Sequence, residues 1–468
     1  MKSFNKKEFK KLGEFINSPY FNKNENIKKL YSALEKIYPV FPDNQTSMEK
    51  IYTGVYGDSE FDYHKLSNLN SDLLQLIKSF FAVKTLQDNA FYSKLFYQTE
   101  LYNKKLELLF TQAEKDTQSA FDKIKFKDED YYFRKYIFNK NKSAYKSVSS
   151  SKIAFELIQN EYDSLYEFSL ISFLKLFTKM LYNKNHGNVI YNMPAFEELR
   201  DYIFNTDLKH NVIYDIYKSI LKLEISKDEN DYLILKNLKQ KYKSELSIED
   251  LHNVFIFMNS FISYRLNKYG DEKYYKDRFE VLKESVDFGF VDPSHIFFSD
   301  FTYYFVSACT VEEFEWAENF LNKFKDGIVP AEETGNCLNF CNAFINYRKK
   351  NFEKALEYFS LTKFRLFFLK VTVKSFTIRI FYELNLEEEA LSSIDAFRHY
   401  LKSEKIILEE QKKAHYEFLK YTTDLFRIRN DKSFGKNIEE ITADIKKMDN
   451  SAFGVKSWLL KKAEELKD

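Results

Sequence analysis

The side chains best suited to chemistry in this 468-residue chain are its three cysteines, Cys309, Cys337 and Cys341, and its seven histidines. Cys337 and Cys341 are four positions apart, so a helix would place both thiols on one face. A structural zinc ion needs four ligands, and no histidine or further cysteine stands near this pair in the sequence. We therefore predict that the two thiols are core side chains and that the chain holds no metal.

The sequence does not indicate covalent or phosphate chemistry either. Cys309 as a nucleophile would need a histidine base, and we expect His295, fourteen positions earlier, on the same helix, where it does not reach the thiol. The chain has no His-Glu-x-x-His pair and no glycine-rich phosphate loop, and the run Glu387–Glu389 is typical of a solvated helix start. We therefore predict a protein that is not an enzyme and uses no cofactor.

Nucleic-acid binding is the alternative that the sequence leaves open. Lys and Arg number 71 against 70 Asp and Glu, so no overall field attracts a polyanion. Residues 46–81 predict a short helix, a turn and a longer helix, as in a helix-turn-helix, but Asp62 opens the second helix and no arginine follows to read base edges. Lysines gather at the amino terminus with a spacing that also suits the solvated face of an amphipathic helix: Lys2, Lys6, Lys7, Lys10 and Lys11. A bacterial regulator with a helix-turn-helix-like N-terminal unit is therefore the second hypothesis.

The elements that position these side chains are predicted to be helices. The chain has only 10 Gly and 6 Pro, which favours long helices with short connections. The stretch 338–401 predicts two helical hairpins in tandem, and Ala355 and Ala390 stand at the same point of each, thirty-five positions apart. Tetratricopeptide repeats have about 34 residues and place a small residue where two helices cross closely. A weaker copy lies at Ala317, thirty-eight positions before Ala355.

We therefore predict an all-α fold of stacked helical hairpins, an α-solenoid that is tetratricopeptide-like in its C-terminal half and has a separate N-terminal helical unit. The predicted division has an N-terminal helical unit at 1–87 and a central helical region at 88–190. Helical-hairpin repeats follow at 191–434, tetratricopeptide-like from about 271, and capping helices at 435–468.

The expected compartment is the cytoplasm. Charges interrupt the first residues everywhere, so the chain lacks the apolar core of a signal peptide. The densest apolar stretch, residues 168–182, contains Lys175 and Lys179 and falls short of the roughly 20 apolar residues of a membrane span. An odd, small number of cysteines suggests a reducing environment without a disulfide framework. We expect no membrane insertion.

Two stretches carry a resemblance to a known set of proteins. The first is the N-terminal string Ser18-Pro19-Tyr20-Phe21-Asn22 together with Ser71-Asp72-Leu73-Leu74, and the second is Phe314-Glu315-Trp316-Ala317 followed by the hairpin through Ala355. In these the chain resembles a large set of uncharacterised all-helical proteins from Bacteroidota genomes with tetratricopeptide-like repeats. The resemblance covers the two ends of the chain better than its middle. It implies a helical fold in a bacterial cytoplasm and supplies no catalytic residues.

The leading functional hypothesis is a protein- or peptide-binding scaffold or adaptor. In tetratricopeptide-like stacks the first helix of each hairpin lines a concave face, and Tyr and Arg are frequent carriers of interface energy. Arg348 and Arg379 could hold an acidic group or a C-terminal carboxylate, whereas Phe340 and Phe344 stand where carboxylate clamps of this repeat class have Lys and Asn. The alternative is that these aromatics pack on the next helix and the arginines are solvated. We expect an open curved surface, not a closed reaction chamber, formed by Thr302, Tyr303, Phe344, Tyr347, Arg348, Ser375, Arg379 and Tyr382.

Overall fold

The computed structural model describes residues 3–41, 45–146, 151–187, 189–404, 409–430, 437–448 and 454–467. The fold is all-α: the described residues form 22 α-helices and one pair of two-residue strands, and helices that follow each other in the chain pack together. The described helices include none that is long and apolar enough to cross a bilayer. The predicted boundary at residue 435 lies outside the described residues.

The chain divides into two compact units, and each is described by itself. Unit 1 consists of residues 1–125 and 133–165, and unit 2 consists of residues 126–132 and 166–468. The first boundary, between residues 125 and 126, precedes α7 (Glu129–Lys146), and the other two fall inside α7 and inside α8 (Ser151–Gly187). This division is coarser than the four segments expected from the sequence, which stay a prediction.

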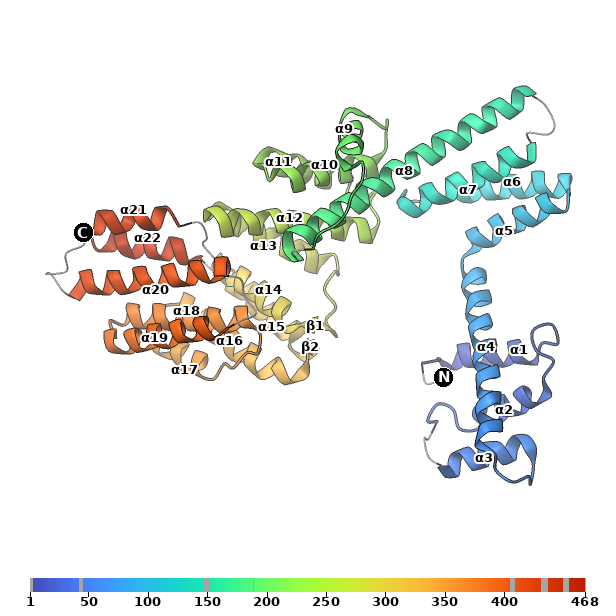
Figure 1. The fold of residues 1–468 in the computed structure, drawn as a ribbon, viewed down its shortest axis with the longest axis horizontal. Helices are drawn as coiled ribbons and strands as arrows, with labels where there is room; N and C mark the ends of the chain where they lie inside the picture. The colour runs from blue at the N-terminus through green and yellow to red at the C-terminus, as the bar shows by residue number, and fades with distance from the viewer. Residues whose placement is uncertain are drawn as a thin grey trace. The chain divides into compact units, whose positions relative to one another are not determined.

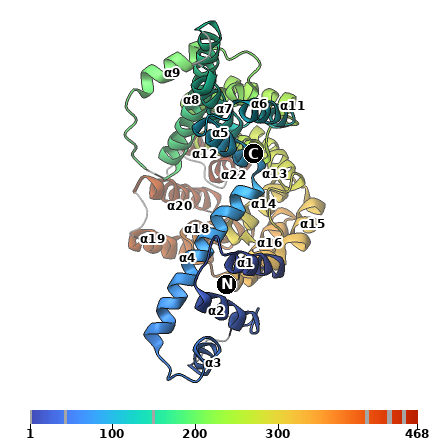
Figure 2. The same ribbon diagram turned by 90° about the vertical axis from the view of Figure 1, so that its right-hand side faces the viewer.

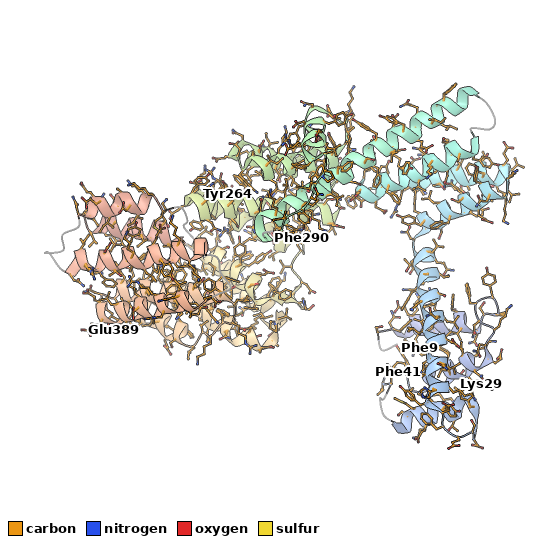
Figure 3. The ribbon with its side chains drawn as sticks, in the orientation of Figure 1. Phe9, Lys29, Phe41, Tyr264, Phe290 and Glu389 are labelled. Atoms are coloured by element: carbon orange, nitrogen blue, oxygen red, sulfur yellow. The ribbon has the colours of Figure 1, made fainter. Side chains whose placement is uncertain are left out.

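The first half of unit 1 is built around α1, α2 and α4, which contact one another (Figure 2). Asn5 caps α1 through a capping box with Glu8, so two free backbone N–H groups gain acceptors. Phe9 lies in the core of this half, with its ring 5.1 Å from that of Tyr31 and 6.2 Å from that of Phe41 (Figure 3). The helices of this half are α1 (Lys6–Asn17), α2 (Glu25–Glu35), α3 (Gln45–Tyr56) and α4 (Tyr63–Asp88).

The second half of unit 1 packs α5 (Ala90–Asn103) and α6 (Glu107–Asp122) as a hairpin with the unit-1 part of α7. Phe91 and Phe121 meet edge to face at 4.5 Å, and Phe110 stacks on Tyr145 at 4.0 Å. Aromatic side chains therefore fill this small core, in keeping with the 18% aromatic content of the chain.

Unit 2 is a longer stack of helices in which most helices pack on a helix that is adjacent in the sequence (Figure 1). Side-chain caps mark starts that the sequence predicts: Asp228 accepts a bond from the Asn230 amide, and Ser247 accepts one from the Asp250 amide. Its first helices are α9 (Phe196–Asn205), α10 (Val212–Ser226), α11 (Glu229–Tyr242), α12 (Ile248–Tyr269) and α13 (Lys273–Asp287). They are followed by α14 (Phe298–Thr310), α15 (Phe314–Phe324), α16 (Thr334–Arg348), α17 (Phe352–Ser360), α18 (Phe367–Glu383), α19 (Glu387–Ser403), α20 (Glu409–Asn430), α21 (Ile438–Lys446) and α22 (Val455–Glu465).

Three consecutive hairpins of unit 2 share one turn. One residue in the connection between the two helices of each hairpin has a left-handed backbone, with φ of 65° at Glu312, 62° at Lys350 and 56° at Asn385. In each turn the next amide bonds back to a carbonyl five residues earlier, which satisfies one of the free carbonyls of the helix end. Five positions after these residues stand the three alanines predicted at close crossings, and all three are fully buried: Ala317, Ala355 and Ala390.

The sequence did not predict the two short strands, one of which precedes the α14–α15 hairpin and one of which follows it. β1 (Ile296–Phe297) pairs in parallel with β2 (Ile328–Val329), with Ile296 opposite Ile328. Gly327 precedes β2, and a Cβ there would come within 2.1 Å of the Pro293 carbonyl oxygen, so only glycine fits.

The first turn of α19 contains the acidic run Glu387–Glu389, and Glu389 is exposed there, as the sequence predicts for a solvated helix start (Figure 3).

Candidate binding cavity

A cavity of about 910 Å³ lies within unit 2. The first helices of the three hairpins, α14, α16 and α18, supply more than half of its wall. Helices α12, α13 and α22, the first residue of α17 (Phe352) and the connecting residues Glu272, Lys350 and Gly454 supply the rest. Of the described residues, none of α15 or α19 lines it. The cavity is therefore on the side of the hairpins where the sequence places the binding face.

The structure brings six of the eight predicted face residues together around this cavity: Thr302, Tyr303, Phe344, Tyr347, Arg348 and Arg379. Ser375 and Tyr382 are not among the lining residues, and each is only 3% exposed. The Tyr382 ring packs at 4.7 Å from Phe426 and 5.3 Å from Trp458, which makes it a core side chain. The binding role of the other six remains a prediction.

Arg348, at the end of α16, keeps part of its guanidinium available. One terminal nitrogen donates to the Thr310 carbonyl at 3.0 Å. The nearest carboxylate, Glu312, is 3.7 Å away and its side chain is 74% exposed, so this pair adds little stability. The Nε–H of Arg348 is buried and has no hydrogen-bond acceptor among the described residues.

Arg379, on α18, has a different setting. It is 3% exposed, and its guanidinium lies over three rings, 4.7 Å from Phe376 and 5.7 Å from both Phe418 and Trp458. Burial lowers the pKa of Arg379, and the Tyr347 hydroxyl, which interacts with the guanidinium, acts in the opposite direction. Arg379 therefore packs as a charged part of the core at the floor of the cavity.

Sequence reasoning missed Arg278 and Tyr275 of α13, which precede the clearest repeats. The Arg278 guanidinium lies 5.2 Å from the Tyr303 ring and donates to the Ser263 hydroxyl at 3.2 Å. Burial raises the pKa of Tyr275, while Arg278, Arg379 and Arg348 all act to lower that pKa. All three guanidinium groups are thus close enough to act on one phenol. A repeat pattern that could be aligned before Pro293 would have pointed to these residues. The sequence of α13 does not align with the later hairpins.

The other missed wall is α22, which the sequence assigns to a cap with a charged outer face. Its Trp458 donates to Glu383 at 3.2 Å, and the nearly buried Lys462 pairs with Glu383 and Glu465, both at 2.8 Å. Burial by itself lowers the pKa of Lys462, but hydrogen bonds to these two carboxylates outweigh burial and raise the pKa. Because α22 contributes to the lining, a helix from outside the three hairpins also borders this space; the open curved face expected from the sequence stays a prediction.

The thiols and histidines lie apart from any such arrangement. Cys309, Cys337 and Cys341 are fully buried, and burial raises the pKa of Cys309 and of Cys337 to about 12. The sequence led us to expect His295 on the same helix as Cys309, and this expectation is wrong. His295 precedes β1, whereas Cys309 lies near the C-terminal end of α14. Helix α14 begins at Phe298 because β1 holds the preceding residues extended. Within the described part of the chain, no group of three or more metal-binding side chains is arranged around one point.

The residues on which the nucleic-acid hypothesis depends lie in unit 1. Helix α3 packs on α2, and Asp62 caps α4, which runs for 26 residues. On α1, Lys10 and Lys11 are exposed, and Lys2 lies outside the described residues. This hypothesis stays a prediction.

Comparison with known proteins adds no further identification. No protein-family model, no curated protein and no solved structure matches the chain. The interpretation of the cavity therefore depends on its own geometry and charge.

Proposed function

We propose that the chain is a scaffold or adaptor of the tetratricopeptide-like, α-solenoid kind, and that unit 2 binds a peptide segment of a protein partner in the cavity. The observation that carries the proposal is the lining of α14, α16 and α18, where arginine and aromatic side chains face one space of about 910 Å³. Small-molecule pockets span about 300–1,000 Å³, so this volume is at the upper end and suits a segment of several residues.

The composition of the wall supports a peptide as the occupant. Phe344, Tyr347 and Trp458 give flat apolar surface, while the hydroxyl groups of Ser263 and Thr310 and the guanidinium of Arg348 give polar contacts. Tyr, Trp and Arg are enriched where interface energy is concentrated. The shared turns and buried alanines of the three hairpins support the repeat assignment.

The test blocks the cavity without altering the core. Lys461 lines the cavity and is exposed, whereas the three native cysteines are fully buried. A Lys461→Cys variant of the full chain can therefore be labelled at one site with a bulky maleimide. Binding is measured as retention of a pool of random heptapeptides during size-exclusion chromatography, with the peptides identified by mass spectrometry.

We expect the unlabelled variant to retain peptides and the labelled one to lose at least about tenfold of that retention, equivalent to about 1.4 kcal/mol. The control is Arg398→Cys with the same label, because Arg398 is exposed on α19, which contributes nothing to the lining among the described residues. Equal retention by both labelled proteins, or no retention by any of them, would reject peptide binding in this cavity.

A further inference from the structure

The charges around the cavity are unbalanced. Its lining contains six cationic side chains and three carboxylates. Two of the carboxylates, Glu383 and Glu465, are engaged by Lys462, and the third, Glu272, is exposed. A partly enclosed space with low-dielectric walls concentrates the field of such an excess, so an anion is attracted into it.

The excess positive charge is concentrated at two guanidinium groups. Arg278 forms no ion pair with a described carboxylate, and it donates a hydrogen bond to the neutral Ser263 hydroxyl. Arg348 has only the distant, exposed Glu312. The Nε–H groups of both arginines are buried and donate to no acceptor among the described residues. Both side chains line the cavity, so an oxyanion that enters it can form charge-assisted hydrogen bonds with the other N–H groups of the two guanidinium groups.

The third arginine serves a different purpose. The Arg379 guanidinium lies against the rings of Phe376 and Trp458 and interacts with the Tyr347 hydroxyl. It therefore adds positive charge to the floor of the cavity, but fewer of its N–H groups are accessible to a ligand. The expectation from the sequence paired Arg348 with Arg379. The geometry instead pairs Arg348 with Arg278, because Arg379 is only 3% exposed, whereas Arg278 and Arg348 line the cavity as half-buried side chains without a close carboxylate partner among the described residues.

We propose that Arg278 and Arg348 form a carboxylate subsite of the cavity, so that the peptide bound there is recognised by a carboxylate placed next to an apolar side chain. Arginine binds carboxylates through paired N–H donors, and a buried, charge-assisted contact is about twice as strong as a neutral one. The Phe344 and Trp458 rings supply the neighbouring apolar wall. The inference rests on the proposed peptide binding and specifies the chemistry of the segment bound.

Two sources of the carboxylate are distinguished by the peptides used. One heptapeptide pool has free C-termini and no Asp or Glu, a second has amidated C-termini and includes Asp and Glu, and a third is amidated and lacks both. The full chain is tested as wild type, as the double variant Arg278→Gln and Arg348→Gln, and as Arg398→Gln, which removes a positive charge away from the cavity.

The expected result is retention of at least one carboxylate-containing pool about tenfold above the third pool, and loss of that preference in the double variant but not in Arg398→Gln. Preference for the first pool assigns the subsite to a chain terminus, and preference for the second assigns it to an acidic side chain. Equal retention of all three pools overturns the carboxylate subsite and leaves peptide binding standing. Retention of none overturns both.

Discussion

The hairpin α5–α6 of unit 1 and the hairpin α16–α17 of unit 2 share the same turn and differ at the residue that follows it. Lys105 and Lys350 are left-handed, with φ of 57° and 62°, and the amide after each bonds to a carbonyl five residues earlier at 3.0 and 2.9 Å. Five positions beyond stands Phe110 in the first hairpin and Ala355 in the second. Both residues are buried, at 1% and 0% exposure.

The difference teaches which part of a repeat is set by the backbone and which by the side chains. The turn reverses the chain in both hairpins through the same hydrogen bonds. In unit 1 the neighbouring α7 supplies Tyr145, whose ring stacks on Phe110 and fills the crossing. In unit 2 the crossing is occupied by Ala355, and the large rings of Phe340 and Phe359 meet beside it at 5.9 Å. The same turn therefore accommodates either a large ring at this position, as Phe110 in unit 1, or a small residue, as Ala355 in unit 2; we call the first the wide crossing and the second the close crossing.

The largest expected effect comes from emptying the wide crossing. Phe110→Ala should destabilise unit 1 by about 3–5 kcal/mol, because the stack on Tyr145 is lost and a cavity remains. Hydrogen exchange read on peptides from α5, α6 and residues 133–146 should show faster opening, while peptides from unit 2 keep their rates. The control Phe96→Ala removes a ring that is 60% exposed and should change stability by no more than about 0.5 kcal/mol.

Filling the close crossing is expected to cost less. Ala355→Phe should destabilise unit 2 by about 1–3 kcal/mol, since a ring has no room where the helices meet and neighbours must shift. Chemical denaturation with hydrogen exchange on α16 and α17 measures the change. The adjacent Lys354→Phe, at an exposed position, is the matched control. If both variants were equally stable, the small residue would not be what permits the close approach.

The sequence was sufficient for the helices but not for every copy of this turn. Ala317, Ala355 and Ala390 marked the three hairpins of unit 2 because a small residue at a crossing repeats in the sequence. The α5–α6 copy has Phe110 at that place, so its helices were predicted and its likeness to the others was not. A pattern of side-chain size cannot report a turn that is fixed by backbone hydrogen bonds.

The sequence predicted the residues of the candidate site only where they belong to hairpins that could be aligned with one another. The frame placed Tyr303, Phe344 and Arg348 on one face, and the structure brings them to one cavity. It did not place Arg278, which lies before the first of the three alanine-marked hairpins, or Lys462, more than a hundred positions after Arg348. Lys462 reaches the cavity because α22, the last helix, packs on α18, where Lys462 donates to Glu383. A contact between residues so far apart in the sequence is not encoded by any local periodicity.

The smallest effect tests the shared turn itself. Lys105→Gly should stabilise unit 1 by about 0.5–1 kcal/mol, because the left-handed conformation strains a Cβ and this strain exceeds the extra chain entropy that glycine brings to the unfolded state. Asn385→Gly should change stability by only a few tenths of a kcal/mol, roughly zero, since asparagine already tolerates this conformation. Both changes in stability are measured from the midpoint of chemical denaturation, provided that the dependence of the unfolding free energy on denaturant concentration is unchanged. A loss of stability in Lys105→Gly would mean that the lysine side chain, and not the turn, stabilises this reversal.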